Sequence, residues 1–431
     1  MNEVLIRGAK IARGDVKDIL IQDGVIVNID DSIDKDCQLL DASGLRAFSG
    51  FVDLHTHLRE PGFEQSETIL SGSKAAAMGG YTAVNAMANT SPVADSAAVV
   101  EQIHRIGLEA GYVEVQPIGA ISVGLAGKEL AELGTMNKSA AAVSVFSDDG
   151  HCVSDSLLMK RALEYVKGFG GVIAQHAQDP NLTTGAQMNA GELAIKLGLS
   201  GWPSVAEASI VARDVLLTEL TGSRLHVCHV STKETVDVIR WAKSRGISVT
   251  AEVTPHHLLL TEDLVKDYNP IFKVNPPLRT TEDVLACRAA LADGTIDIVA
   301  TDHAPHPEES KQCDWASAAN GMLGLETAAS VVIETMVKTG LIDWNRFQEI
   351  MSIKPAEIAQ MSRQGRGLKV GSPANIALLD VSSEHVVGSV SESLSSNNPY
   401  VGMKITGSVK HVLYKGTLTV FDSKIKEIGM S

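Results

Sequence analysis

The chain has 431 residues, of which 44% are hydrophobic and 21% charged, the composition of an ordinary globular protein with enough chain for a complete α/β barrel. Its formal net charge of −15 argues against nucleic-acid binding, which needs a basic face. The sequence has no signal-peptide pattern at its start, no apolar run of about 18 residues, and no CxxC spacing among its five cysteines. We therefore expect a cytoplasmic protein that binds neither nucleic acid nor membrane.

Both ends of the chain are rich in short β-type runs separated by tight turns. Near the N-terminus these runs cover residues 4–11, 18–29 and 38–44, and similar runs cover 374–381 and 411–421. Alternating apolar residues and turn dipeptides such as Asp-Gly are typical of β-hairpins. We predict that residues 1–48 and 366–431 combine into one small β-sandwich domain beside a larger central domain.

The centre of the chain alternates between β-branched runs and longer amphipathic stretches. Two of the stretches with helical spacing cover residues 156–169 and 233–246. The β-type runs cover residues 47–57, 81–89, 113–121, 141–150, 171–177, 224–230, 247–257 and 296–306. Eight strands separated by helices predict an α/β fold of the (β/α)8 TIM-barrel type over residues 49–365.

Polar side chains recur at the ends of these runs. They are His55 and His57, Asn89, Asp148 and Asp149, His176, His229, and Asp302. The active site of such a barrel lies at the C-terminal ends of its strands, so these side chains should converge. Imidazole and carboxylate donors together predict a divalent metal site, and zinc suits them best. Asp148 and Asp149 are adjacent and point to opposite sides of a strand, so only one of them can face the metal.

Six motifs occur in a fixed order: DLHTHLREPG, NTSPVADS, FSDDG, TPHHL, NPPLR and TDHAPH. With them the sequence resembles the dihydroorotases of the amidohydrolase superfamily, and most closely the bacterial monofunctional enzymes with an aspartate at the metal bridge. The resemblance covers nearly the whole chain. It implies a cyclic amidohydrolase that reversibly converts N-carbamoyl-L-aspartate to L-dihydroorotate in pyrimidine biosynthesis.

The resemblance also implies a set of metal ligands. His55, His57 and Asp302 would hold one zinc ion, His176 and His229 would hold a second, and Asp149 would bridge the two. Many relatives bridge with a carboxylated lysine instead, but the fourth run has no lysine within it. One or two zinc ions per subunit are therefore expected.

The substrate-binding and catalytic roles follow from the same resemblance. Asp302 would be the catalytic acid and base, taking a proton from a zinc-bound hydroxide and delivering it to the departing ring nitrogen. The substrate would be held by Arg59 and Asn89 at its α-carboxylate, by Asn275 and His306 at the ring and carboxylate, and by backbone groups of Asn320 and Gly321 at the ring amide. The long polar segment 304–321 is predicted to be a lid.

Two other functions stay open on the residues alone. The first is another cyclic amidase, a hydantoinase or an allantoinase, although Arg59 beside Asn89 favours a ring that carries a carboxylate. The second is a dihydroorotase-like subunit that scaffolds another pyrimidine enzyme, such as aspartate transcarbamoylase. Such a scaffold should have lost metal ligands, whereas this chain has all six. A homodimer is the family-level expectation.

Overall fold

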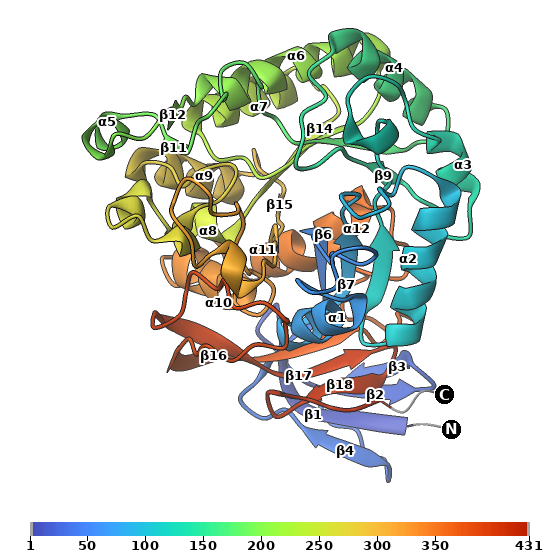
Figure 1. Ribbon diagram of the computed structural model, residues 1–431. Coiled ribbons are helices and arrows are strands. Elements are labelled where there is room, and N and C mark those ends of the chain that lie inside the picture. The colour runs from blue at the N-terminus through green and yellow to red at the C-terminus, as the bar shows by residue number, and fades with distance from the viewer. Residues whose placement is uncertain (1–2, 429–431) are drawn as a thin grey trace.

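The computed structural model describes residues 3–428, and within them eight short parallel strands form a barrel surrounded by helices (Figure 1). The strands are β6 (Phe51–Thr56), β7 (Tyr81–Ala86), β8 (Glu114–Pro117), β9 (Val145–Phe146), β10 (Val172–Gln175), β13 (Leu225–Val227), β14 (Val249–Val253) and β15 (Ile298–Val299). Each begins inside one of the eight predicted runs, so the predicted (β/α)8 barrel is confirmed. The runs extend beyond the strands because they continue into the loops at the barrel rim.

The strands pair in parallel in chain order, and two isolated bridges complete the ring. Gly119 pairs with Phe146 and so joins the ends of β8 and β9. Thr56 pairs with His303 and so joins β6 to the segment after β15. Because all the strands run in the same direction, their C-terminal ends lie at one rim of the barrel.

Helices cover the outside of the barrel. The α-helices are α1 (Ile69–Met78), α2 (Ala97–Ala110), α3 (Leu133–Lys138), α4 (Ser156–Lys167), α5 (Glu192–Leu197), α6 (Val205–Thr221), α7 (Lys233–Ser244), α8 (Pro255–Leu259), α9 (Thr281–Asp293), α10 (Ala328–Val332), α11 (Trp344–Gln348) and α12 (Lys354–Ile358). Short 3₁₀ turns cover Val123–Leu125, Glu262–Val265, Pro270–Phe272 and Glu308–Ser310, and π turns cover Ile333–Val337 and Glu349–Ile353. A small pair of strands, β11 (Met188–Asn189) and β12 (Gly201–Trp202), lies between β10 and α6.

Local sequence explains where the two predicted helices begin. The side chain of Asp155 accepts a hydrogen bond from the Leu158 amide at the start of α4, at 2.7 Å. Thr232 caps α7 in the same way. Such caps satisfy amides that have no partner within the helix and contribute about 1 kcal/mol each.

The interior of the barrel is filled with apolar side chains. One buried cluster takes Val52 and Leu54 from β6, residues from the other strands, and Ile358 and Met361 from the end of the α12 region. This packing closes the barrel at the end opposite the rim that carries the polar residues. Chemistry is therefore confined to the C-terminal rim.

The two chain ends build the second domain. Its strands are β1 (Glu3–Ile11), β2 (Val16–Gln22), β3 (Val25–Asp30), β4 (Gln38–Asp41), β5 (Arg46–Ser49), β16 (Ile376–Val386), β17 (Lys404–Tyr414), β18 (Thr417–Phe421) and β19 (Lys424–Ile425). In the described part of the chain they form one hydrogen-bonded sheet in the order β19-β18-β17-β16-β5-β1-β2-β3, with β4 beside β1. Antiparallel β5 and β16 join the two ends. The predicted β-sandwich from both chain ends is confirmed, while its boundaries at residues 48 and 366 stay a prediction.

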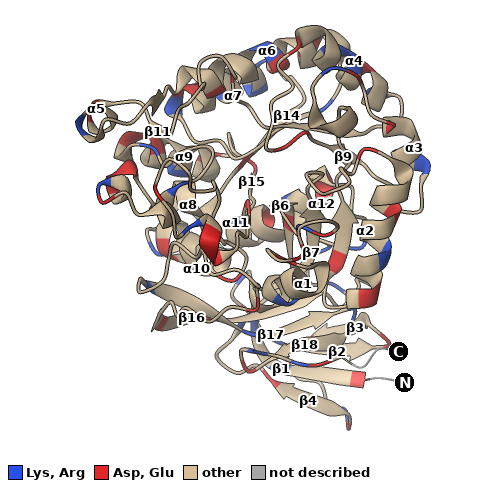
Figure 2. Cartoon of the chain, in the orientation of Figure 1, with Lys and Arg blue, Asp and Glu red and all other residues tan. Residues whose placement is uncertain are grey.

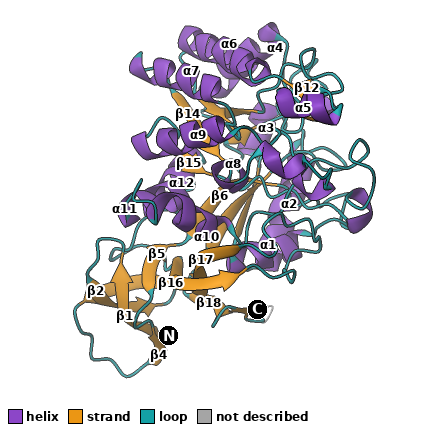
Figure 3. Ribbon diagram, turned by 90° about the vertical axis from the view of Figure 1, so that its left-hand side faces the viewer, coloured by secondary structure: helices purple, strands orange, loops and turns teal. Residues whose placement is uncertain are grey.

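The β-domain lies below the barrel in the view of Figure 1, and the turned view of Figure 3 shows its strands below the layer of barrel helices. Basic and acidic residues are interspersed along the outer helices such as α4, α6 and α7 (Figure 2). None of the helices in residues 3–428 is long and apolar enough to cross a membrane.

The segment that links β16 to β17 reaches from the β-domain to the barrel loops. Ser395 donates a hydrogen bond to the Ser66 carbonyl at 2.7 Å, and the Leu394 amide donates to Glu67 at 3.1 Å. Asn397 is buried and donates to the carbonyls of Ala304 and Gly321 at 2.9 and 3.1 Å. The C-terminal domain therefore helps to hold the loops of the barrel rim.

Candidate metal and active site

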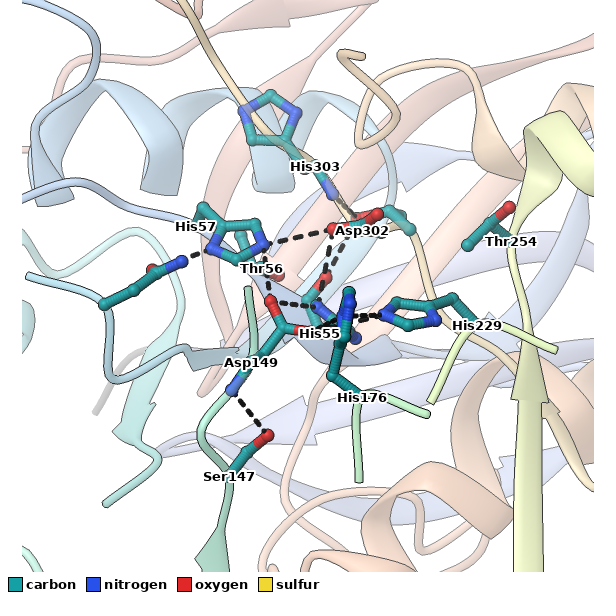
Figure 4. A network of polar contacts seen from close by, with 12 residues as sticks. His55, Thr56, His57, Ser147, Asp149, His176, His229, Thr254, Asp302 and His303 are labelled. Carbon is teal, nitrogen blue, oxygen red and sulfur yellow. Dashed lines mark hydrogen bonds and ion pairs between the residues drawn. The ribbon is translucent and has the colours of Figure 1, made fainter. Parts of the chain in front are cut away.

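The C-terminal rim brings the predicted ligands together. Figure 4 shows His55, His57, Asp149, His176, His229 and Asp302 pointing toward one another. All six are buried, and each lies within three residues of the end of its strand. The convergence follows from the parallel barrel, because residues far apart in sequence occupy the same rim.

One group of ligand atoms surrounds a first centre. The Nε2 atoms of His55 and His57 each lie 3.3 Å from Oδ2 of Asp149. The same nitrogens lie 3.4 and 3.1 Å from Oδ1 of Asp302. Four donors on a tetrahedral zinc ion, at Zn–N distances near 2.0–2.1 Å, would be about 3.3 Å apart. The side chains therefore fit a single cation between them.

The second centre uses the other oxygen of Asp149. Its Oδ1 lies 3.2 Å from Nδ1 of His176 and 3.2 Å from Nε2 of His229. The two imidazole nitrogens are 2.9 Å apart. Asp149 therefore turns one oxygen toward each group, which is the arrangement of a carboxylate that bridges two metal ions. These buried histidine and aspartate clusters are consistent with a binuclear site.

The electrostatics also fit a bound cation. Nε2 of His55 is buried and has no hydrogen-bond partner among residues 3–428. Burial by itself would lower the pKa of His55, but Asp149, Glu252 and Asp302 raise it well above its usual value. For the carboxyl group of Asp149 burial has the opposite effect and would raise the pKa, yet the histidines around it hold that pKa well below the usual range. Asp149 is therefore ionised and available as a ligand.

The neighbouring acid, Asp148, has a different position. It accepts hydrogen bonds from the amides of Ile121 and Ser122 at 2.8 and 2.9 Å and from the Ser122 hydroxyl. These contacts tie the loop after β8 to the loop after β9. Asp149 is thus the acid that faces the cluster, and Asp148 supports the loop.

Glu252 lies behind the ligands and fixes the orientation of the His55 imidazole. Nδ1 of His55 lies 2.7 Å from Glu252, which is fully buried on β14. Glu252 also contacts Nε2 of His226 at 2.9 Å and accepts from the His229 amide at 3.2 Å. Sequence reasoning missed Glu252, although an acidic residue inside the otherwise apolar end of a barrel strand was an available signal. A thiol, Cys228, also lies beside His55 and Glu252, and burial raises its pKa.

Asn89 supports the second imidazole of the HxH motif. Its Oδ1 lies 2.9 Å from Nδ1 of His57. That contact leaves Nε2 of His57 to face Asp149 and Asp302. Asn89 was predicted to bind substrate, and the structure places its Oδ1 against His57; a substrate contact of its NH₂ group stays a prediction.

Three site residues have left-handed backbone conformations. The φ angles are +62° for Arg59, +30° for His229 and +47° for Asp302. For residues other than glycine, such conformations cost on the order of 1–3 kcal/mol each and persist where the surroundings fix them. All three positions belong to the predicted site, so the strained backbone is located at the same rim as the predicted ligands.

Arg59 lies beside the metal ligands. Its Nε donates to the Pro305 carbonyl at 3.2 Å. Burial lowers the pKa of Arg59 to about 10, while Asp302 and Asp149 act in the opposite direction. The guanidinium therefore remains charged near neutral pH and offers a forked donor that suits a carboxylate.

Of the remaining predicted substrate contacts, Asn275 lies between α8 and α9, and the other three lie on the loop after β15. Nε2 of His306 contacts the Asn320 carbonyl at 2.7 Å, and the Gly321 amide donates to the Lys273 carbonyl at 3.0 Å. Burial lowers the pKa of His306 to about 3, so its imidazole is neutral. His306, Asn320 and Gly321 are thus adjacent, with several of their polar groups engaged within the loop. Their contacts with the substrate stay a prediction.

The segment 304–321 is tied to the rest of the protein at several points, and Lys311 makes some of these contacts. Nζ of Lys311 donates to the carbonyls of Pro270, Lys273 and Ala319 at 3.0, 3.0 and 2.7 Å. A cavity of about 560 Å³ beside it is lined in part by His306 and Asn397. The segment therefore borders an opening next to the site, and its motion as a lid stays a prediction.

His256 and His257, at the end of the seventh run, form the start of helix α8. The Nδ1 of His257 contacts the Thr254 hydroxyl at 2.8 Å, and its Nε2 contacts the Pro277 carbonyl at 3.3 Å. The two rings pack with centroids 4.5 Å apart. Both ring nitrogens of His257 are therefore engaged within this region.

Comparison with known proteins gives the same picture. A family model described as "Dihydro-orotase-like" matches residues 46–235. A dihydroorotase of Streptomyces coelicolor is 58% identical over 99% of this chain and 100% of its own length, and one of Mycobacterium tuberculosis is 52% identical over 98% and 99%. Among solved structures, an L-hydantoinase (dihydropyrimidinase) from Arthrobacter aurescens matches with a TM-score of 0.88 at 25% identity, covering 99% of this chain and 98% of that one. A dihydropyrimidinase from Brevibacillus agri gives 0.86 at 23%, covering 98% and 96%.

A (β/α)8 barrel with a β-sandwich from both chain ends, and with histidine and aspartate clusters at the C-terminal rim, defines a metal-dependent hydrolase of the amidohydrolase class. The solved hydantoinases establish this architecture but share at most a quarter of the sequence in the comparisons above. The full-length identity of more than one half decides the family: the chain belongs to the dihydroorotases.

Proposed function

We propose that the chain is a dihydroorotase that closes N-carbamoyl-L-aspartate, with uptake of one proton, to L-dihydroorotate and water, and reverses that reaction, in pyrimidine biosynthesis. The observation that carries the proposal is the 58% identity with a dihydroorotase over the whole of both chains. A hydantoinase or allantoinase activity is the alternative, but the hydantoinase structures are similar in fold at only 23–25% identity.

We further propose zinc as the metal and two ions as the full complement. His55, His57 and Asp302 would hold one ion, His176 and His229 the other, and Asp149 would bridge them. The spacing of 3.1–3.4 Å between ligand atoms of the first centre supports this assignment. Bound there, zinc would polarise the reacting carbonyl and lower the pKa of a coordinated water.

Asp302 would move the proton. In ring opening, water adds its oxygen to the amide carbonyl carbon while the bond between that carbon and the ring nitrogen breaks. Oδ1 of Asp302 faces His55 and His57, so Oδ2 is the atom that would take the proton of the attacking water and deliver it to the departing nitrogen. Ring closure would use the same groups in reverse.

The substrate would be held by its charges and by its ring. Arg59 would pair with the α-carboxylate, assisted by the amide of Asn89. Asn275 and His306 would contact the ring and the carboxylate, and the backbone of Asn320 and Gly321 would bind the ring amide. Arg59 and Pro305 are 246 residues apart in the sequence, but one hydrogen bond joins them. The charged guanidinium therefore lies beside the loop after β15, which supports a carboxylate site there.

Three properties complete the proposal: a cytoplasmic location, a homodimeric assembly, and association with aspartate transcarbamoylase as an active partner. The alternative of an inert scaffold is disfavoured, because the six predicted metal ligands are present and converge.

The test is ring opening of L-dihydroorotate by the purified zinc-loaded protein, with hydantoin and allantoin assayed in parallel. We expect turnover of dihydroorotate alone and its loss on addition of a chelator. Turnover of another ring would overturn the assignment of substrate, and zinc binding without any turnover would favour the scaffold.

A further inference from the structure

Gln178 lies between a proposed metal ligand and a proposed substrate-binding residue. It follows His176 by two positions, just beyond β10. Its Oε1 is 2.8 Å from Nε2 of His176 and accepts from Nδ2 of Asn275 at 3.1 Å. A single amide oxygen therefore contacts residues from two different rim loops.

The orientation of the Gln178 amide follows from its other end. Nε2 of Gln178 donates to the Thr183 hydroxyl at 2.8 Å. That hydroxyl uses its one proton for the Asp179 carbonyl, at 2.9 Å, and so can only accept from Gln178. The NH₂ group of Gln178 must face Thr183, and its oxygen must face His176 and Asn275.

The contacts of His176 require the same orientation of the Gln178 amide. Nδ1 of His176 faces Asp149 and His229, so Nε2 carries the ring proton and needs an acceptor. Since the Gln178 oxygen is that acceptor, Asn275 can meet it only with its NH₂ group. Oδ1 of Asn275 is then left over, and it is buried without a hydrogen-bond partner among residues 3–428.

We infer that Gln178 is a positioning residue that fixes His176 for the metal and, through Asn275, presents a buried acceptor oxygen to an N–H of the substrate. The inference rests on the proposed function. The scissile ring nitrogen is the one served by Asp302, so the N–H for Asn275 is that of the other ring nitrogen, beside the carbon that carries the carboxylate. A substrate without that proton would leave Oδ1 unpaired, which is costly in a buried site.

The experiment compares three variants of the full-length protein. Gln178→Leu removes the oxygen at nearly constant size, and Gln178→Glu keeps an acceptor toward both partners. Gln187→Leu is the matched control, because Gln187 is half-buried in the same inter-strand segment and its Oε1 has no hydrogen-bond partner in the described chain. Zinc affinity is measured by competition with a chelator, and KM and kcat are measured at saturating zinc for L-dihydroorotate and for its analogue methylated on the non-scissile nitrogen.

We expect Gln178→Leu to weaken zinc binding about 10- to 100-fold, as is usual when a partner of a metal ligand is lost. At saturating zinc it should still raise KM about 10-fold, with kcat changed less. Methylation of the substrate should raise KM strongly for the native protein and little further for Gln178→Leu, because both remove one interaction. Gln187→Leu should behave like the native protein. Gln178→Glu keeps the acceptor for His176 but loses the donor to Thr183, so it should bind zinc less tightly than the native protein and more tightly than Gln178→Leu.

Two results would overturn the inference: a native KM for Gln178→Leu at saturating zinc, or equal effects of methylation on the native protein and on Gln178→Leu. A Gln178→Glu variant as defective as Gln178→Leu would also contradict it, since the acceptor is retained there. If the native protein does not turn over dihydroorotate, the proposed function fails, whereas the zinc affinities of the Leu and Glu variants still test the positioning of His176.

Discussion

Substitution of Glu252 by glutamine should weaken metal binding without unfolding the barrel. Glu252 is fully buried and contacts Nδ1 of His55 at 2.7 Å and Nε2 of His226 at 2.9 Å. Burial would raise the pKa of Glu252, but the two histidines lower it to about 2, so the native residue is a carboxylate. The Glu252→Gln variant keeps the shape and removes the charge and one acceptor.

The structure indicates how the variant can adapt. The amide oxygen can still accept from His55, and its NH₂ group then faces His226. Nδ1 of His226 lies 2.9 Å from the Thr250 hydroxyl, so His226 can place its proton there and accept from the new amide. The fold is thus retained, and the remaining loss is the negative charge behind His55. We expect zinc affinity to fall about 10- to 100-fold, equivalent to about 1.4–2.7 kcal/mol.

The assay is competition for zinc with a chromogenic chelator, together with thermal unfolding of the metal-free protein. Glu207→Gln is the control, because Glu207 is a buried carboxylate that accepts from Ser231 and Thr232 and contacts no histidine in the described structure. Zinc affinity equal to that of the native protein in Glu252→Gln, or an equal loss in both variants, would refute the assigned role.

Three further substitutions test the rest of the site and its support. Asp302→Asn should lower kcat by about 10²- to 10⁴-fold with little change in substrate affinity, and native turnover would exclude it as the proton carrier. Arg59→Ala should raise KM about 10- to 100-fold by removing a charged hydrogen bond to the carboxylate, so an unchanged KM would count against that contact. Burial raises the pKa of Asp214 to about 6, so its stabilising contribution is complete below about pH 4 and is lost as the pH rises through 6. Relative to the native protein, Asp214→Asn should therefore gain roughly 2–3 kcal/mol in free energy of unfolding as the pH rises from 4 to 8. Melting temperatures of the two proteins that change in parallel over that range would contradict this.

The fold and the ligand set could be predicted because short segments of the sequence indicate both. Each barrel strand is a short β-branched run, and each predicted ligand lies within three residues of the end of its strand. Parallel strands then bring His55, Asp149 and Asp302 to one rim without any further information. The same holds for the β-domain, whose hairpins at both chain ends need one another as partners.

The orientation of the site could not be predicted in the same way. Glu252 reaches His55 across 197 residues, and Asn397 reaches Ala304 from the other domain. Such contacts depend on which side chains share a layer behind the rim, and no short motif records them. The residues alone left the choice between Asp148 and Asp149 open for the same reason, since it depends on where the Ser122 amide lies, and only the family resemblance selected Asp149.

The charge of the site is consistent with an anionic substrate only when the metal is counted. The whole chain carries −15, and the rim itself gathers the carboxylates of Asp149, Asp302 and Glu252 against the single guanidinium of Arg59. Without bound metal ions, protons on the histidines, whose pKa values are raised there, would offset part of this negative charge. Two divalent ions would reverse the sign, because their four positive charges exceed the three negative ones. On this reasoning the metals would serve substrate binding as well as bond cleavage. Arg59 would orient the anionic substrate, and the metal ions would supply most of the electrostatic attraction.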